Sequence, residues 1–189
     1  MKQVQLLPHV ASSRGFTLSE LLISISIMSI LSGITAVGFS SASQAMKGNA
    51  GMQQVRAQLR LARDLAISQR RSMEVQFIAP NEIRTIRWEI PSGMTTVNQY
   101  FLEGNVEFHR FSSVPDTPDG FGITGPVSFT GQTSRFLSNG HFVDEDGAFS
   151  SGNIFLAIQG QPSSQRAVTI FGGTGRSRAY RWDGTQWLE

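Results

Sequence analysis

Residues 14–20 read Arg-Gly-Phe-Thr-Leu-Ser-Glu, and an uncharged run follows them from Leu21 to Met46. As a helix, the apolar segment from Phe16 to Phe39 would be about 36 Å long at roughly 1.5 Å per residue, enough to cross a hydrocarbon core of about 30 Å. Glu20 is the one charged residue in this segment. A carboxylate so placed costs on the order of 2–3 kcal/mol on insertion scales. The stretch therefore predicts a membrane-spanning helix whose acid needs a compensating partner.

The segment before this helix is short and polar, from Met1 to Gly15, and contains Lys2 and Arg14. An ordinary secretory signal has its apolar core before a cleavage site with small residues. Here the order is reversed, because the Gly15–Phe16 junction lies in front of the apolar segment. The pattern G-F-T-L-x-E at residues 15–20 resembles the type IV prepilin signal.

That resemblance implies a processing pathway. A prepilin peptidase would cut between Gly15 and Phe16 and methylate the new N-terminus at Phe16, while the helix stays on the mature chain. Glu20 matches the acid of the family, which is expected to pair with the terminal amine of a neighbouring subunit and so relieve the charge in the membrane. The alternative is a plain single-pass anchor that carries one acid. Many pilins have a proline midway along this helix, whereas this chain has Gly33 and Gly38, each costing about 1 kcal/mol relative to Ala.

Composition limits the rest of the chain to one modest domain. The 189 residues include no cysteine, so disulfides and thiolate metal sites are excluded, and 19 Gly with 13 Phe at 16% charged residues indicate a β-rich fold. Lys2 and Arg14 at one end of the helix balance Lys47 and Arg56 at the other, so charge alone does not orient it. The resemblance places the leader in the cytoplasm and the domain in the periplasm, anchored in the bacterial inner membrane.

Residues 40–51 read as a helix that continues weakly or as a short hinge, because they include Gly48 and Gly51. An amphipathic helix is predicted beyond them from a stripe of apolar residues that Leu61 and Leu65 widen: Met52, Val55, Leu59, Ala62 and Ala66. Arginines form a separate basic row at 56, 60 and 63. They are expected to face water or neighbouring subunits, with a nucleic-acid surface as the alternative.

From Met73 onward the pattern changes to short strands rich in β-branched and aromatic residues, with turns at Ser138-Asn139-Gly140 and Asp183-Gly184. The predicted strands are 73–78, 83–90, 95–102, 106–111, 127–130, 135–137, 141–143, 154–158, 167–171 and 178–182. The expected fold is α+β, with a long N-terminal membrane-spanning helix packed by its C-terminal half on an antiparallel sheet domain. The predicted divisions are a leader at 1–15, a helix at 16–72 (transmembrane 16–39, amphipathic 52–72) and a globular domain at 73–189.

A second resemblance concerns this later part of the chain. The patterns R-x-x-L-x-x-A-R-x-x-A-I-S-x-R (56–70, within the stretch 56–72), F-L-S-N-G (136–140), A-V-T-I (167–170) and G-R-S-R (175–178) are similar to GspH/FimT-type minor pilins and pseudopilins. The resemblance implies a structural subunit of a type II secretion pseudopilus or a type IV pilus, and no enzyme. Its partners would be the prepilin peptidase, other pilin subunits, an inner-membrane assembly platform and membrane lipid.

Signals for other chemistry are weak, and no cofactor is expected. The run Gly120–Gly125 fits G-x-G-x-x-G, but Pro118 and Pro126 flank it and no helix begins there, so it is predicted to be a loop. His109 and His141 lack any catalytic motif around them. Asp144 and Asp146 sit in an acidic turn that offers oxygen ligands for calcium, although such a turn needs no metal in water.

The stretch from Gly175 to Trp182 carries the alternative function. As a strand, it would place Arg176, Arg178, Tyr180 and Trp182 on one face and Arg181 on the other. Cations interleaved with aromatic rings suit a nucleic-acid surface. The stretch also resembles the G-R-x-R motif with which some FimT-type minor pilins hold DNA during natural transformation. A structural terminal strand is the favoured interpretation, because residues 74–189 hold 12 acids against 8 arginines.

Overall fold

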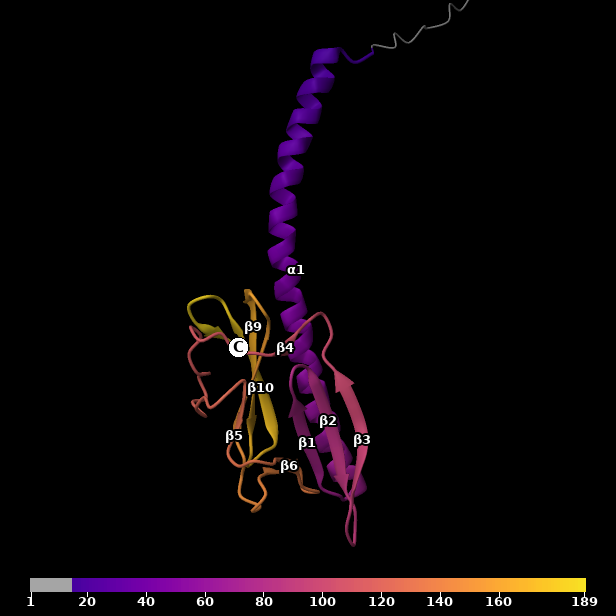
Figure 1. Cartoon of the computed structure of the whole chain (residues 1–189), viewed down its shortest axis with the longest axis vertical. Coiled ribbons are helices and arrows are strands. Elements are labelled where there is room, and N and C mark those ends of the chain that lie inside the picture. Colours follow the sequence, from indigo (N-terminus) through magenta and orange to yellow (C-terminus); the bar gives the residue numbers. More distant parts are fainter. Residues whose placement is uncertain (1–14) are drawn as a thin grey trace, which may run out of the picture. The chain divides into compact units, whose positions relative to one another are not determined.

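The structure is a computed structural model that describes residues 15–189, apart from the side chains at 36–38, 40 and 41. In this part of the chain, one long helix, α1 (Leu18–Gln69), is followed by eleven strands (Figure 1). The predicted α+β class, a helix followed by an antiparallel sheet domain, is confirmed. The chain divides into two compact units after Ser40. Residues 1–14 of the predicted leader lie outside the described residues.

The N-terminal part of α1 is apolar and exposed. Leu18–Thr35 has a mean hydropathy of 1.7 and none of it is buried within the protein, so this segment is long and apolar enough to cross a membrane. Four of its hydroxyl groups are satisfied locally, because Ser24, Ser26, Ser29 and Thr35 each donate to the carbonyl four residues earlier at 2.7–2.8 Å. A polar side chain that bonds to its own helix exposes no free donor to lipid.

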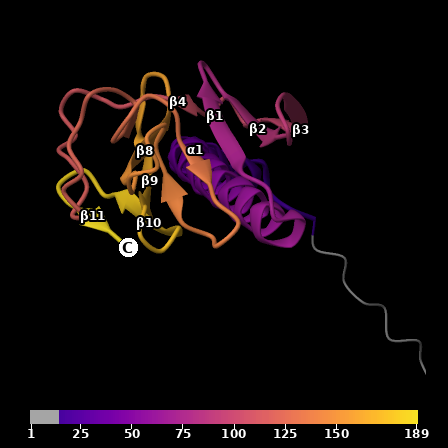
Figure 2. The ribbon, with the colours of Figure 1, turned by 90° about the horizontal axis from the view of Figure 1, so that it is seen from below.

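Beyond residue 51, α1 packs with one face on the strand domain. The predicted stripe is confirmed, since Val55, Leu59, Ala62 and Ala66 are at most 2% exposed and Met52 packs against them. Leu65 also contacts the core, whereas the prediction for Leu61 is wrong, because its side chain is 40% exposed. Figure 2 shows this part of α1 end-on, with β1 and β2 on one side and β8 and β9 on the other.

The helix is continuous through residues 42–51, so of the two predicted alternatives the continuing helix is observed and the hinge is not. Gly48 and Gly51 serve close packing instead. A Cβ at Gly48 would lie 2.4 Å from the backbone oxygen of Ser164, and one at Gly51 would lie 2.7 Å from Cγ1 of Val106. Glycine lowers helix propensity, but here it lets the helix approach the strand domain.

Two antiparallel sheets form the domain. The first follows the order β3–β2–β1–β6–β7, and the second follows β11–β10–β9–β8–β4, with β5 also paired to β8. The bounds in the first sheet are β1 Met73–Ile78, β2 Glu82–Trp88, β3 Met94–Phe101, β6 Arg135–Phe136 and β7 Phe142–Val143. Those in the second sheet are β4 Glu107–Phe108, β5 Val127–Phe129, β8 Gly152–Ile158, β9 Gln161–Phe171, β10 Arg176–Trp182 and β11 Trp187–Leu188.

All ten predicted strands occur, with differences at their ends. β4 is shorter than predicted, β9 begins six residues earlier, at Gln161, and β11 was not predicted. The extension of β9 is polar, Gln-Pro-Ser-Ser-Gln-Arg, and lacks the residues that favour strands. Pairing holds it in place, because Gln161 lies opposite Ile158 and Arg166 lies opposite Leu156 of β8.

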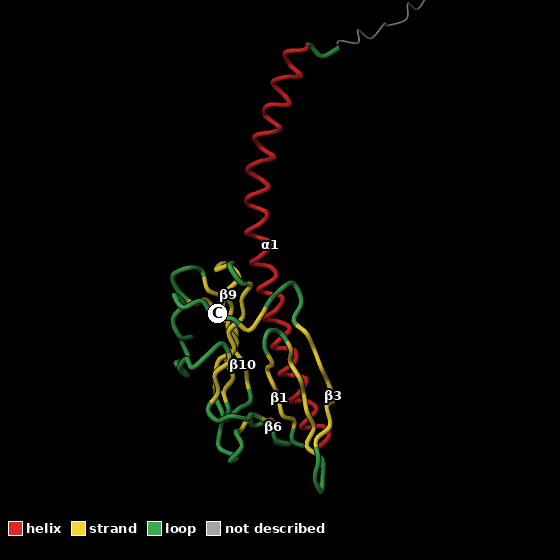
Figure 3. Tube along the Cα trace, in the orientation of Figure 1, coloured by secondary structure: helices red, strands yellow, loops and turns green. Residues whose placement is uncertain are grey.

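The second sheet is covered on both faces. Val168 and Ile170 of β9 join the main core with α1, while Ala167 packs on the opposite face with Phe155 and Tyr180. That opposite face lies under the connection between β4 and β5, which Figure 3 draws as a long loop beside the sheet. Trp187 fixes part of this loop by donating from Nε1 to the carbonyl of Pro115 at 3.2 Å.

Candidate functional site

The N-terminal motif forms a capping box at the start of α1. The Glu20 carboxylate accepts hydrogen bonds from the Thr17 backbone N–H (2.9 Å) and hydroxyl (2.8 Å), and the Thr17 hydroxyl accepts one from the Glu20 N–H (3.2 Å). Such a reciprocal cap satisfies donors that the first turn leaves free. The carboxylate also lies at the positive end of the helix dipole. The acid therefore finds a first partner within its own chain.

The predicted processing junction is open. Phe16 is 85% exposed, and no atom of the described residues lies within 4 Å of the position that a Cβ on Gly15 would occupy. Both residues precede the first turn of α1 and have no helical hydrogen bonds to break. The geometry leaves this backbone accessible to a second protein.

At the other candidate site, β10 alternates as predicted. Its partners on β9 place Arg178 beside Thr169 and Tyr180 beside Ala167, whereas Arg181 lies beside Arg166 on the face toward α1. Tyr180 is only 4% exposed and belongs to the small core cluster with Phe155. One of the four proposed DNA contacts is thus an interior residue.

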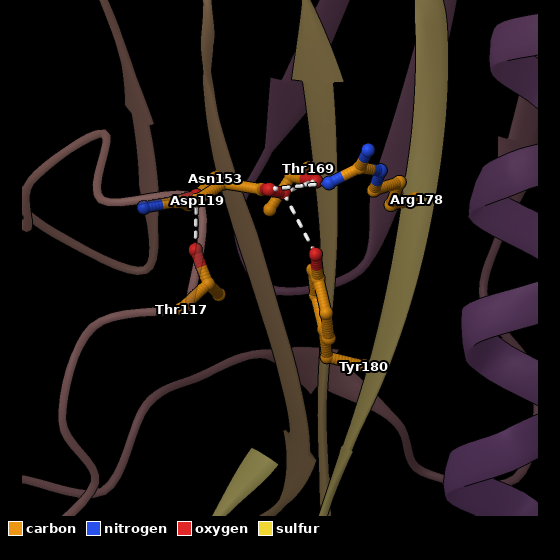
Figure 4. Close-up of polar contacts among 6 residues, drawn as sticks. All are labelled: Thr117, Asp119, Asn153, Thr169, Arg178 and Tyr180. Carbon is orange, nitrogen blue, oxygen red and sulfur yellow. Dashed lines mark hydrogen bonds and ion pairs between the residues drawn. The ribbon is translucent and has the colours of Figure 1, made fainter. Parts of the chain in front are cut away.

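Asp119 contacts side chains on the outer face of β10 and a neighbouring side chain of β9 (Figure 4). Its side chain, 6% exposed, accepts hydrogen bonds from the Thr169 hydroxyl (2.6 Å) and the Tyr180 hydroxyl (3.0 Å), and its second oxygen pairs with Nη1 of Arg178 at 3.0 Å. The Arg178 guanidinium also lies 5.0 Å from the centre of the Phe171 ring. Because the Arg178 guanidinium already contacts a carboxylate and an aromatic ring, it is poorly placed to bind a phosphate.

The pKa shifts of Tyr180 and Arg178 agree with the geometry of this cluster. Burial raises the pKa of the Tyr180 hydroxyl, Arg178 lowers it in part, and the acceptor Asp119 raises it further. The pKa of Arg178 is raised by its contact with Tyr180 and by the charge of Asp119. Tyr180 is therefore a stable hydrogen-bond donor and Arg178 a stable cation at neutral pH. The cluster is a structural clamp between the loop and the sheet.

The remaining predicted DNA residues are separated from one another. Arg176 is exposed at the start of β10, and Arg181 is exposed on the face of the sheet opposite to Arg176 and Arg178. Within the described residues neither forms an ion pair. The structure therefore does not gather Arg176, Arg178, Tyr180 and Arg181 into one exposed surface.

A buried arginine that the sequence analysis did not single out lies next to this strand. Arg166 is 1% exposed, and its guanidinium donates to the Asn49 side chain (2.6 Å) and to the Ala45 carbonyl (2.9 Å) of α1. It also donates to the carbonyls of Ser163 (3.0 Å) and Gln165 (2.7 Å). Burial and then the charge of Arg181 lower the pKa of Arg166 to about 10. This side chain joins the helix to β9 through carbonyl and amide acceptors.

The glycine-rich run at 120–125 is a loop, as predicted. The buried Asn153 holds it, since its amide donates to Asp116 (2.7 Å) and to the Gly122 carbonyl (2.9 Å), and it accepts from the Thr117 hydroxyl at 3.0 Å (Figure 4). Gly120 and Gly122 adopt positive φ angles of 68° and 84°. No helix N-terminus faces this loop in the described chain, so it lacks the geometry of a dinucleotide site.

The weak metal candidates form an ordinary turn. The Asp144 carboxylate accepts from the backbone N–H groups of Asp146 (3.1 Å) and Ala148 (2.9 Å), so it is occupied by its own chain. Between residues 15 and 189, no three metal-ligating side chains converge. His109 and His141 lie beside the rings of Phe111 and Phe149.

Comparisons with known proteins identify the two regions separately. Residues 11–36 match the prokaryotic N-terminal methylation motif, and residues 51–174 match the family described as type II transport protein GspH. No curated protein matches the sequence. Two solved structures are similar: the minor pseudopilin EpsH of the type 2 secretion system of Vibrio cholerae, and the type IV minor pilin FimU of Pseudomonas aeruginosa strain PAO1.

The structural similarity is distant. EpsH is 16% identical with a TM-score of 0.49, covering 71% of this chain and 97% of its own, and FimU is 12% identical with a TM-score of 0.47, covering 80% and 97%. The assignment of a family therefore rests on the two sequence matches, of which the second spans most of the strand domain.

Proposed function

The chain belongs to the type II transport protein GspH family, and from that premise we propose that it is a minor pilin or pseudopilin precursor, cleaved between Gly15 and Phe16 and methylated at Phe16. The observation that carries the proposal is the methylation motif at residues 11–36, which leads directly into a helix apolar enough to span a membrane. Members of this family are structural subunits of filaments and not enzymes.

The proposed location is the bacterial inner membrane, with the strand domain in the periplasm and residues 1–15 as the cytoplasmic leader. The mature chain would enter a type II secretion pseudopilus or a type IV pilus. Its partners would be the prepilin peptidase, other pilin subunits, the assembly platform and membrane lipid, with no cofactor. The open Gly15–Phe16 junction supports access of the peptidase.

A role in DNA uptake is the less favoured alternative. It would need Arg176, Arg178, Tyr180 and Arg181 to act as one surface. The pairing of Arg178 with Asp119 and the burial of Tyr180 count against it.

The first test is processing. N-terminal sequencing and mass spectrometry of the mature protein should give Phe16 as the first residue, with one added methyl group. Gly15→Leu should abolish cleavage, because a side chain would block close approach to the backbone at the junction. Gly33→Leu, which changes a glycine further along the same apolar segment, should be processed normally. A mature chain that begins at any residue other than Phe16 would refute the proposal.

The second test separates the charge of Glu20 from its capping role. Glu20→Gln keeps an oxygen that can accept from Thr17 but removes the charge, whereas Glu20→Ala removes both. If the carboxylate pairs with a neighbour's amine, both variants should insert into the membrane normally and enter filaments at least ten-fold less often, a loss of about 1.4 kcal/mol of docking energy. Incorporation is measured by quantifying the protein in sheared filaments. If Glu20→Gln enters filaments as often as wild type, the charge is not needed for assembly and only the cap matters.

A further inference from the structure

Three arginines are among the residues that line a small hollow between α1 and the start of β10. The hollow has a volume of about 230 Å³ and is lined by Leu59, Arg60, Arg63 and Asp64 of α1 and by Gly175, Arg176 and Ser177. We call it the arginine pocket. It lies where the helix meets the first residues of β10, and the residues of the Asp119 cluster take no part in its lining.

Arg63 is fixed in the wall of this pocket by the backbone. Its guanidinium donates from Nε to the Gly140 carbonyl (3.1 Å) and from Nη2 to the Thr174 carbonyl (3.2 Å). A Cβ on Gly140 or on Gly175 would lie 3.0 Å from Nε of Arg63, and both glycines have positive φ angles. Two glycine backbones thus close around this side chain. A guanidinium has five N–H donors, so the remaining ones are available in a preset orientation.

The arginines of the pocket form no ion pair within the described chain. The ion pairs there join Arg84 to Glu82, Arg87 to Glu89 and Arg178 to Asp119, and none involves Arg60, Arg63 or Arg176. Asp64 offsets only one of the three charges. The pocket therefore has an excess of positive charge and of hydrogen-bond donors.

The chemistry of the pocket suits an oxyanion such as a carboxylate. Guanidinium groups bind carboxylates and phosphates through paired hydrogen bonds, and the Ser177 hydroxyl can add another donor. A nucleic-acid strand needs a continuous basic track with exposed rings, but here the lining includes Asp64, and Tyr180 of the same strand is buried. We propose that the arginine pocket binds an acidic side chain of a neighbouring protein subunit.

This inference rests on the proposed function only for the source of the carboxylate. Full-length protein in non-ionic detergent is titrated into fluorescein-labelled hexaglutamate at low ionic strength, and anisotropy is recorded. Wild type should bind, and Arg60→Gln/Arg176→Gln should weaken binding at least ten-fold. Both substituted residues are exposed, so the variant should fold. The matched control, Arg70→Gln/Arg181→Gln, removes two exposed arginines outside the pocket and should weaken binding less than two-fold.

Three outcomes would overturn the inference: no binding by wild type, equal weakening in the control pair, or tighter binding of labelled hexathymidylate with the same dependence on Arg60 and Arg176. The last result would assign the pocket to nucleic acid. None of these results changes the N-terminus of the mature protein or the effect of Glu20, so the filament role is judged separately.

Discussion

At the scale of single residues, the Asp119 side chain links a loop to the second sheet. One nearly buried carboxylate accepts from Thr169 and Tyr180 and pairs with Arg178, so it attaches the loop between β4 and β5 to two strands. Hydrogen bonds to a charged group are worth about 1.5–3 kcal/mol each, and a buried donor that loses its acceptor is costly. The stability of this face therefore depends on a loop residue rather than on the core alone.

We expect Asp119→Asn to lower the free energy of unfolding by about 2–3 kcal/mol, because the amide leaves Arg178 without a counter-charge and satisfies fewer donors. For a chain of this size that is a fall in Tm of about 4–12 °C, measured by circular dichroism in detergent. Asp146→Asn, which alters an exposed carboxylate in a turn, is the control and should change stability by less than about 0.5 kcal/mol.

Combining the change with Arg178→Gln gives a second check. The double variant should be more stable than the sum of the two single effects predicts, because the partners share one interaction. Strict additivity would mean that the ion pair contributes nothing measurable.

At the residue scale, the alternation of β10 could be predicted from the sequence, but the Asp119 partner of Arg178 could not. Asp119 is 59 residues before Arg178 and lies in a proline- and glycine-rich loop with no periodicity, so nothing local connects the two. Arg166 was missed for a similar reason, because the polar run that contains it resembles a loop. Residues 14–20, in contrast, are a local motif, and their cap at Thr17 and Glu20 follows the capping-box spacing.

At the scale of elements, glycines at different positions of α1 have different structural roles. Gly33 has no neighbouring atom within 4 Å, whereas Gly48 faces the Ser164 backbone and Gly51 faces Val106. All three look alike in sequence as helix-weakening positions. The periodic apolar stripe predicted the packed face correctly because helical geometry alone fixes it. The close approach at Gly48 depends on β9, whose polar start was not predicted as a strand.

Gly48→Ala and Gly33→Ala should therefore have different effects on stability. Alanine gains about 1 kcal/mol of helix propensity at either site. At Gly48 the added Cβ meets a backbone oxygen that cannot easily move, and overpacking of this kind costs about 1–3 kcal/mol or more. We expect a lower Tm for Gly48→Ala and an unchanged or higher Tm for Gly33→Ala. Equal stability of the two variants would contradict the tight contact with Ser164.

At the scale of the whole molecule, charge separates the two functional hypotheses. Lys2 and Arg14 are the basic residues of the first fifteen, so residues 16–189 hold 14 basic against 14 acidic side chains. A polyanion would meet no net positive field on such a chain, and that field normally supplies most nonspecific DNA affinity. The arginine pocket, with three arginines and one aspartate in its lining, has a local excess of positive charge instead.

We therefore expect the full chain in non-ionic detergent to show no measurable binding of mixed-sequence DNA at about 0.15 M salt. Arg176→Gln/Arg178→Gln should match wild type in this assay, because Arg178 is already paired with Asp119. Arg84→Gln/Arg87→Gln is the control, since it removes two arginines that also have acidic partners. The DNA-uptake hypothesis gives a different result: binding at low salt, with the slope of log affinity against log salt reduced by roughly 0.9 for each phosphate that the variant no longer neutralises. The decisive outcome is salt-sensitive DNA binding that is lost in Arg176→Gln/Arg178→Gln and kept in the control. It would establish the nucleic-acid role and overturn our preference for a purely structural subunit.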